Sequence, residues 1–200
     1  SNECLSTNKL SSIDPLYETF MTSNFSSNYF FIHRKSLSFN ITEACNYAES
    51  FALKPNPYYK SFDGIGGDCT NFVSQCWNYA GIPMTLEWHG ADSPSDLHPS
   101  FGGIINTDAW TKVPDFYDYM VDNGIATVKW SSTEVNIGDV IQFWNPGDQA
   151  WTHAGIITNL NTPYGITYGG HTEDHFQKPL RDVYPHAYTE VRFLCPINAY

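Results

Sequence analysis

The sequence has few basic residues and no long apolar run. Ten Lys and Arg stand against 21 Asp and Glu, so the formal net charge is −11. Nucleic acids and anionic membrane surfaces bind basic proteins, and we therefore expect neither as a partner. No stretch approaches the ~18 consecutive apolar residues of a membrane span, so membrane insertion is not expected. The chain also lacks internal repeats and low-complexity tracts.

The sequence also lacks closely paired cysteines. Its five cysteines include no C-x-x-C motif, which argues against a zinc ribbon. An odd number leaves at least one thiol free, and a free thiol in an exported protein is a candidate reactive group. The chain begins with Ser1 and Asn2 instead of Met. We interpret it as an exported protein, extracellular or bound to the cell wall, whose signal peptide has been removed.

The chain is large enough for one substantial domain. Its 200 residues are 42% hydrophobic and 16% aromatic, which suffices for a real core and for a cleft with aromatic walls. We predict an N-terminal extension over residues 1–35, with a short strand at 29–32, packed on a main domain over residues 36–200. A monomer is expected.

In the first part of the main domain, apolar residues recur at helical spacing. In the second part they form short β-branched and aromatic runs separated by turn residues. These patterns predict helices at 40–52, 69–80 and 114–123, and strands at 125–129, 140–144, 153–159, 166–170 and 189–196. Residues 84–112 are irregular but carry Trp88 and Trp110, which indicates a lid or cleft wall. Helices followed by about five strands predict an α+β fold, with an antiparallel sheet packed against the second helix.

The most informative segment is GGDCTNFVSQCW, residues 66–77. It places Cys69 at the first helical position after a flexible glycine pair, with Asp68 as the expected N-cap. The helix dipole favours thiolate there, and thiolate is the nucleophilic form of cysteine. The alternative is a small buried hydrophobe, which is our interpretation of Cys76.

Among seven histidines, His153 is the best candidate for a base. It opens an apolar strand directly after a polar turn, and Gly155 allows close backbone approach there. His171 ends the next strand, so antiparallel pairing would bring it near His153 as an orienting group. Asp174 is a second candidate for that role. The alternatives are a surface histidine at position 153 and, at position 171, a histidine that only caps a strand or binds a loop carbonyl.

These segments, in this order, resemble a known family. The matches are NPYY at 56–59, Phe62, GGDCTNFVSQ at 66–75, GIPM at 81–84, Trp110, GDVIQ at 138–142, His153, HT at 171–172 and PL at 179–180. Together they cover residues 40–195 and resemble the amidase domain family of Gram-positive bacteria. That family is similar to papain-like cell-wall hydrolases of the NlpC and CHAP types.

The resemblance implies a cysteine amidase or peptidase that cleaves amide bonds of cell-wall peptidoglycan without metal or cofactor. Cys69 would be the nucleophile, His153 the general base and His171 the orienting residue. The Cys69 N–H would hold the oxyanion, with Tyr59 or Gln75 as a second donor. Expected substrate-binding residues are Asp68, Thr70, Tyr59 and Trp88.

Two other functions fit parts of the sequence. One is a catalytically inactive cell-wall binding module on the same fold. The other is a metal hydrolase that uses His171, Asp174 and His175, since an i, i+4 histidine pair suits a metal site on a helix. Glycines before His171 and Pro179 after it disfavour a helix there.

Overall fold

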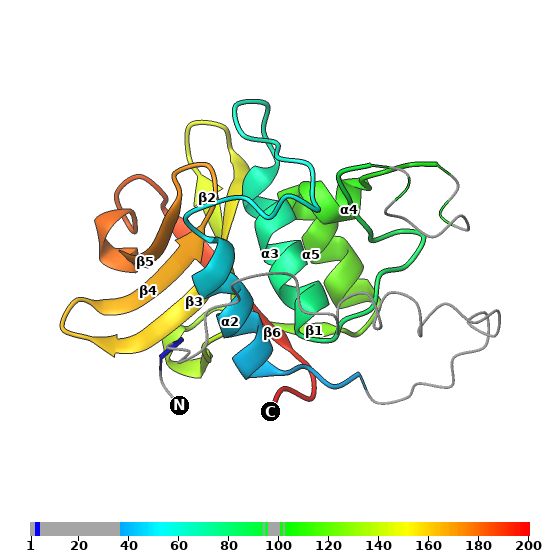
Figure 1. Ribbon diagram of the computed structural model, residues 1–200. Helices are drawn as coiled ribbons and strands as arrows, with labels where there is room; N and C mark the ends of the chain where they lie inside the picture. The colour runs from blue at the N-terminus through cyan, green and yellow to red at the C-terminus, as the bar shows by residue number, and fades with distance from the viewer. Residues whose placement is uncertain (1–2, 5–36, 94, 96–100, 102) are drawn as a thin grey trace.

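The computed structural model describes residues 3–4, 37–93, 95, 101 and 103–200 (Figure 1). The predicted strand at 29–32 and most of the extension lie outside this part. The helices are α2 (Ile41–Phe51), α3 (Asp68–Tyr79), α4 (Asp108–Thr111) and α5 (Val113–Asp122), with short 3-10 turns η4 (Ser132–Glu134) and η5 (Leu180–Asp182). The strands are β1 (Ala126–Lys129), β2 (Val140–Asn145), β3 (Ala150–Thr162), β4 (Gly165–Gly170), β5 (His175–Pro179) and β6 (Glu190–Pro196).

The strands form one antiparallel sheet in the order β1-β6-β2-β3-β4-β5. Strands β2 to β5 form a meander, and β6 returns to lie between β1 and β2. The predicted α+β class is confirmed, with six strands instead of five. The additional strand, β5, has only five residues and follows a turn directly, so its sequence carries too short an alternation to be recognised.

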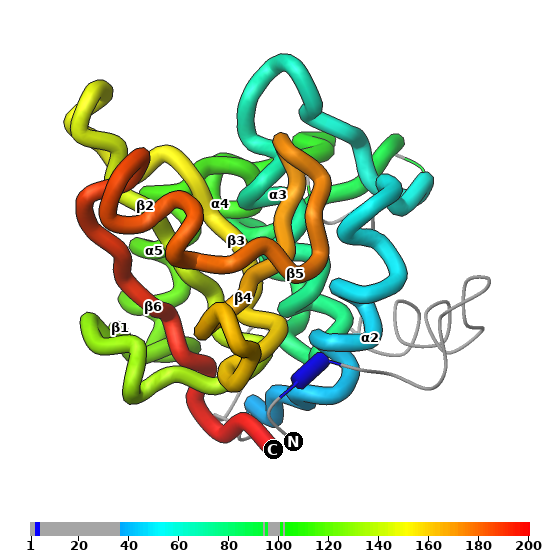
Figure 2. Tube along the Cα trace, turned by 90° about the vertical axis from the view of Figure 1, so that its left-hand side faces the viewer, coloured from blue at the N-terminus to red at the C-terminus, as the bar shows by residue number. Residues whose placement is uncertain are grey.

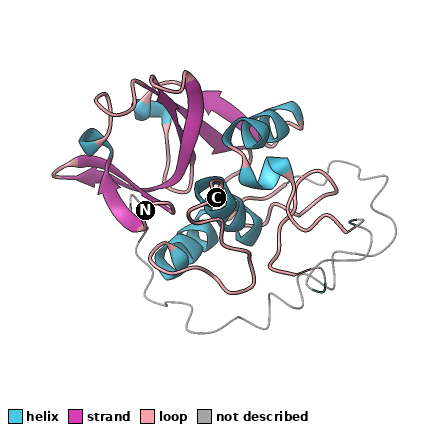
Figure 3. Ribbon diagram, turned by 90° about the horizontal axis from the view of Figure 1, so that it is seen from above, coloured by secondary structure: helices cyan, strands magenta, loops and turns pink. Residues whose placement is uncertain are grey.

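Side chains alternate across the sheet, and both faces are covered. On β2, Val140 belongs to the core shared with the helices, whereas Ile141 and Phe143 belong to a second core on the other face. Helices α3 and α5 pack against β3 on the first face. Seen from above, the strands lie on one side of the molecule and the longer helices mostly on the other (Figure 3). The sheet is thus a central layer that can carry functional groups on either face.

Helix α3 begins one residue earlier than predicted. Its N-cap is Gly67, with φ 100° in the left-handed region, and Asp68 is already helical and makes no capping bond. A Cβ at position 67 would lie 2.9 Å from the carbonyl oxygen of Thr111. Both backbone conformation and space therefore require glycine at 67. The prediction of Asp68 as N-cap was wrong, and its carboxylate is available for other partners.

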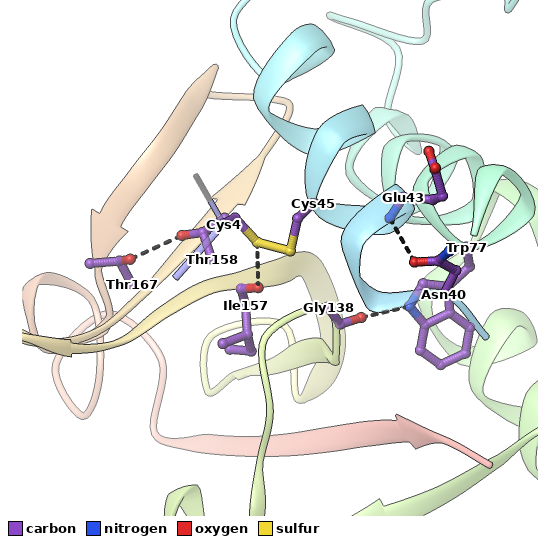
Figure 4. The surroundings of a disulfide bond; sticks show 9 residues. All are labelled: Cys4, Asn40, Glu43, Cys45, Trp77, Gly138, Ile157, Thr158 and Thr167. Atoms are coloured by element: carbon purple, nitrogen blue, oxygen red, sulfur yellow. Dashed lines mark hydrogen bonds between the residues drawn. A yellow bond between two sulfur atoms is a disulfide. The ribbon is translucent and has the colours of Figure 1, made fainter. Parts of the chain in front are cut away.

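A disulfide between Cys4 and Cys45 ties the start of the chain to α2 (Figure 4). The Cys4 N–H also donates to the Thr158 carbonyl oxygen at 2.7 Å, so residues 3–4 lie along β3. The free cysteines among the described residues are Cys69, Cys76 and Cys195.

The described part of residues 84–112 belongs to the core. Trp88 and Trp110 are fully buried, with ring centroids 4.7 Å apart, and the Trp88 Nε1–H donates to the Ser74 hydroxyl. Trp88 therefore lines the protein interior in this structure, where we expected a cleft wall. Within the described residues, no helix is long and apolar enough to cross a membrane.

Gly155 leaves the space in which the ring of Tyr168 crosses β3. A Cβ at position 155 would lie 2.5 Å from Cδ2 of Tyr168. We expect Gly155→Ala to lower the free energy of unfolding by ~1–3 kcal/mol, because the buried ring must move. Gly170→Ala is the matched control, since its Cβ would meet nothing closer than 3.5 Å. Urea unfolding of both variants checks this, and equal stability of the two would contradict it.

Candidate active site

Cys69 is the second residue of α3 and is 4% exposed. Its sulfur makes hydrogen bonds with the backbone of Ala154 on β3 and of Thr70, and lies 3.8 Å from the Thr70 hydroxyl. Helix α3 packs against β3 and β4 (Figure 2). The thiol is therefore placed where the start of a helix meets the first half of the central strand.

Burial raises the pKa of the Cys69 thiol, and hydrogen bonds from Ala154 and Thr70 offset this only in part. The sequence predicted that the helix start would favour thiolate. The structure instead favours the neutral thiol, because removing the sulfur from water disfavours its charge more than nearby dipoles favour it. A base must therefore remove the proton when the sulfur reacts.

His153 faces Phe143 of β2 across the ladder and lies among three aromatic rings. Its ring centroid is 5.4 Å from Phe143, 6.4 Å from Tyr168 and 5.9 Å from Tyr188, whose ring is almost parallel to it. Burial above all, with smaller effects of His175 and Lys178, lowers the pKa of His153 to about 4. The imidazole is therefore neutral at pH 7, as a general base must be.

The thiol and the imidazole are linked only indirectly, through Ala154 and Tyr188. Cys69 and the Ala154 side chain belong to the core on the helical face, whereas His153 contacts Phe143 and Tyr168 of the core on the other face. Ala154, bonded to the sulfur through its backbone, directly follows His153. The ring of Tyr188 stacks on His153, and the pKa of Tyr188 is raised by burial and, to a smaller extent, by its proximity to the Cys69 thiol. No hydrogen bond joins Cys69 to His153 within the described residues. Tyr188 was missed because it lies in an irregular segment between η5 and β6 that shows no periodic pattern.

His171 lies on Asp68 and not on His153. Its Nδ1–H donates to Oδ2 of Asp68 at 2.9 Å, and its Nε2–H donates to the Phe51 carbonyl oxygen at 2.8 Å. A carbonyl oxygen only accepts, and the carboxylate of an aspartate with a lowered pKa also only accepts. Both ring nitrogens must therefore carry hydrogen, and His171 is an imidazolium in a buried ion pair.

Strand alternation explains this placement. Tyr168 contacts His153 on one face of the sheet, and His171 comes three residues later. It therefore falls on the opposite face, where its ring stacks on Phe72 of α3 at 4.3 Å. Adjacent strands brought the two histidines to the same end of the sheet, but their side chains point in opposite directions.

Asp68 is saturated by hydrogen bonds. Besides His171, its carboxylate accepts from the Phe62 N–H at 2.7 Å and from Nδ2 of Asn71 at 3.1 Å. Burial alone would raise the pKa of Asp68, but these bonds outweigh it and lower the pKa. Burial likewise acts to lower the pKa of His171, and its bonds to Asp68 and Phe51 raise it instead. Asp68, expected to bind substrate, thus holds protein groups here.

The other expected residues lie around this pair or in the core. Thr70 is fully buried beside the sulfur, and Tyr59 is 4% exposed and stacks on Trp110. Gln75 accepts a hydrogen bond from the Tyr47 hydroxyl, and its side chain is buried in the interior. Cys76 is fully buried, as its position in the apolar stripe indicated.

The alternative metal site does not assemble as expected. His175 begins a strand, so it is not one helical turn after His171, and both nitrogens of His171 are occupied. Among the residues that the structure describes, no group of three His, Cys, Asp or Glu side chains could hold a metal ion.

Comparison with known proteins decides the family. Residues 38–194 match the family model described as "Putative amidase domain". The chain belongs to this amidase family. The matched residues run from before α2 into β6, so the family domain contains Cys69, His153 and His171. The family expected from the sequence motifs is confirmed.

Two similar proteins come from Bacillus subtilis strain 168. The amidase-family chain is 34% identical over 103 residues to Uncharacterized protein YjcM and 32% identical over 123 residues to Uncharacterized protein YhbB. The alignments cover 50% and 57% of this chain but 21% and 35% of those proteins. The chain thus matches about a fifth and a third of the curated relatives' lengths. No solved structure matches it significantly.

The buried ion pair predicts a pH-dependent stability. The pKa of His171 is raised above 6.5, so its contribution is complete below pH 6.5 and is lost as pH rises through the folded-state pKa. The pKa of Asp68 lies below 3.8, so its contribution is lost as pH falls through that lower value. We expect His171→Gln to cost ~3–5 kcal/mol near pH 6, because Asp68 loses its buried counter-charge.

Urea unfolding between pH 4 and pH 9 measures this effect. The loss caused by His171→Gln should shrink above neutral pH, whereas the exposed control His186→Gln should change little at any pH. A loss that is constant across this range would contradict the ion pair.

Proposed function

We propose that this amidase-family protein is a cysteine-nucleophile amidase or endopeptidase of papain-like, NlpC-type architecture. The proposed substrate is an amide bond of bacterial cell-wall peptidoglycan. The observation that carries the proposal is the position of Cys69: its sulfur lies at the start of α3 beside the backbone of Ala154, the residue after His153. The thiol at the start of α3 and the neutral imidazole on β3 are the two groups that nucleophilic acyl transfer requires, and the proposed reaction requires their side chains to meet at the start of β3.

The reaction begins from an uncharged pair. As the Cys69 sulfur attacks the carbonyl carbon, the imidazole of His153 takes the thiol proton, and the carbonyl oxygen becomes an oxyanion. His153 then gives that proton to the leaving amine as the C–N bond breaks, which leaves a thioester on Cys69. Water, deprotonated by the same imidazole, attacks the thioester, and the carboxylic acid leaves as the thiol re-forms.

The first turn of α3 supplies a donor for the oxyanion. Intrahelical bonding begins with the Asn71 N–H, which donates to the Gly67 carbonyl oxygen at 3.0 Å. The Cys69 N–H comes before it and has no acceptor within the helix. An N–H on the nucleophile itself is well placed for the oxygen of the carbon under attack.

The Asp68–His171 pair supports this site from the helical face of the sheet. It joins the residue before the nucleophile to the residue after β4, and through Phe51 to the end of α2. We therefore assign His171 a positioning role toward the first turn of α3. This replaces the role toward His153 that the sequence suggested.

The Cys4–Cys45 disulfide supports the proposal that the protein acts outside the cytoplasm. Stable disulfides form mainly in oxidising compartments. A cell-wall substrate would be reached there, which agrees with the proposed chemistry.

Replacing the nucleophile tests the mechanism. We expect Cys69→Ala to reduce release of new amine ends from purified peptidoglycan at least ~10³-fold, because thioester formation is lost. The control is Cys195→Ser, which alters a free thiol on β6 outside the site and should keep turnover. Mass spectrometry of the released fragments identifies the cleaved bond. If Cys69→Ala released fragments as fast as the parent, this function would be refuted in favour of a binding module.

The pKa of His153 predicts the acid limit of the reaction. The base must be neutral, and its pKa is about 4. The rate kcat/KM should therefore stay nearly constant down to about pH 5 and fall about tenfold per pH unit below pH 4. Initial rates on peptidoglycan fragments in buffers from pH 3.5 to 8 measure this limit. A fall centred near pH 6.5 would mean that His153 is hydrated like an ordinary surface histidine.

A further inference from the structure

His175 has an unpartnered buried nitrogen. It is the first residue of β5 and lies opposite Gly170 in the ladder. Its Nδ1 contacts the carbonyl oxygen of Glu173. Its Nε2 is buried without a hydrogen-bond partner, the single such side-chain atom among the described residues. A buried polar atom without a partner is costly, and nearly all buried polar atoms in proteins have one, so this nitrogen calls for a partner.

The ring of His175 lies on the same face of the sheet as His153. Its Nε2 and Cε1 are 3.6 Å from the point where a Cβ on Gly170 would lie, so the ring leans over β4 toward β3. The ring centroids of His175 and Tyr168 are 4.8 Å apart in an edge contact, and those of His153 and Tyr168 are 6.4 Å apart. Tyr168 is thus the common neighbour of both imidazoles.

The hydrogen-bond pattern fixes the chemistry of Nε2. The Glu173 carbonyl can only accept, so Nδ1 of His175 carries the hydrogen. Burial lowers the pKa of His175, which keeps the ring neutral. In the neutral ring the other nitrogen, Nε2, is an acceptor with a free lone pair. The group that could satisfy Nε2 of His175 is therefore a hydrogen-bond donor.

We propose that His175 is a positioning residue for His153, and that its Nε2 accepts a His153 N–H through one water molecule. This inference rests on the proposed function. An acceptor for that N–H fixes which nitrogen of His153 carries the proton and leaves the other free for the thiol. It also stabilises the imidazolium that forms when His153 takes the thiol proton.

Among the described residues, no hydrogen bond from another titratable group to His153 is seen. Tyr168 and Tyr188 present their rings, Cys69 is the proton donor, and Glu173 and Lys178 act on His153 only through their charge. A neutral acceptor adds no charge repulsion when His153 becomes positive. Protonation of His175 would remove the acceptor and repel the imidazolium, so reactivity should fall when His175 is charged.

Alkylation of Cys69 by iodoacetamide tests this without a known substrate. The rate is followed at Cys69 by peptide mass spectrometry from pH 4 to 9. His175→Phe keeps the ring shape but removes both nitrogens, and we expect the rate at pH 7 to fall ~10-fold or more, with an altered pH profile. His175→Gln retains an acceptor oxygen and should recover much of the rate. His186→Phe is the exposed control and should match the parent.

Two further measurements separate the possible failures. If His153→Phe leaves the alkylation rate unchanged, the proposed function itself fails. If His153→Phe slows alkylation but His175→Phe does not, only the role of His175 is overturned. Should His175→Phe unfold, as thermal unfolding would show, ¹⁵N NMR of the parent decides the matter. A single His153 tautomer that responds to His175→Gln supports the role, and an unperturbed equal mixture of tautomers overturns it.

Discussion

The start of α3 depends on one buried ion pair, between the Asp68 carboxylate and the His171 imidazolium. Gly67 turns the chain into the helix without a side-chain cap, so the first turn needs another anchor. The ion pair supplies it, and the Phe62 N–H and the Asn71 amide complete the carboxylate's hydrogen bonds. A charged pair this deep is stable only when its remaining donors and acceptors are also satisfied, and here they are. The position of Cys69 follows, because it is the next residue.

The two faces of the sheet surround their histidines differently. On the helical face, His171 holds the start of α3 through its ion pair with Asp68. On the other face, His153 lies among aromatic rings that keep it neutral. The two histidines thus have opposite protonation states. The carboxylate of Asp68 stabilises the charged form of His171, whereas burial away from water disfavours the charged form of His153. The same burial that makes His153 a weak base also keeps the thiol of Cys69 protonated, so both groups would enter the proposed reaction uncharged.

Much of the fold could be predicted from periodicity, whereas the site could be predicted only in part. The apolar stripes located α2, α3 and α5, and short β-branched runs located five of the six strands. Residue type and local position marked Cys69, His153 and His171. The local sequence does not determine in which direction a side chain points relative to a neighbouring strand. His171 was therefore expected on His153, and Tyr188, in an irregular segment, carried no signal. Trp88 was expected at a cleft because its segment is irregular, yet irregular backbone can be as buried as a helix.

The burial of His153 also determines when its imidazole can accept a proton. A histidine held neutral by its surroundings accepts a proton only when something stabilises the resulting imidazolium. Phe143 presents no charge, and Tyr188 stacks face to face, so neither ring offers an acceptor to the His153 N–H. The cost of forming the imidazolium must then be met by the developing negative charge on sulfur and substrate and by any acceptor on β5. In the proposed mechanism, the aromatic surroundings would restrict proton transfer to the moment when a carbonyl carbon is in place to take the sulfur's electrons.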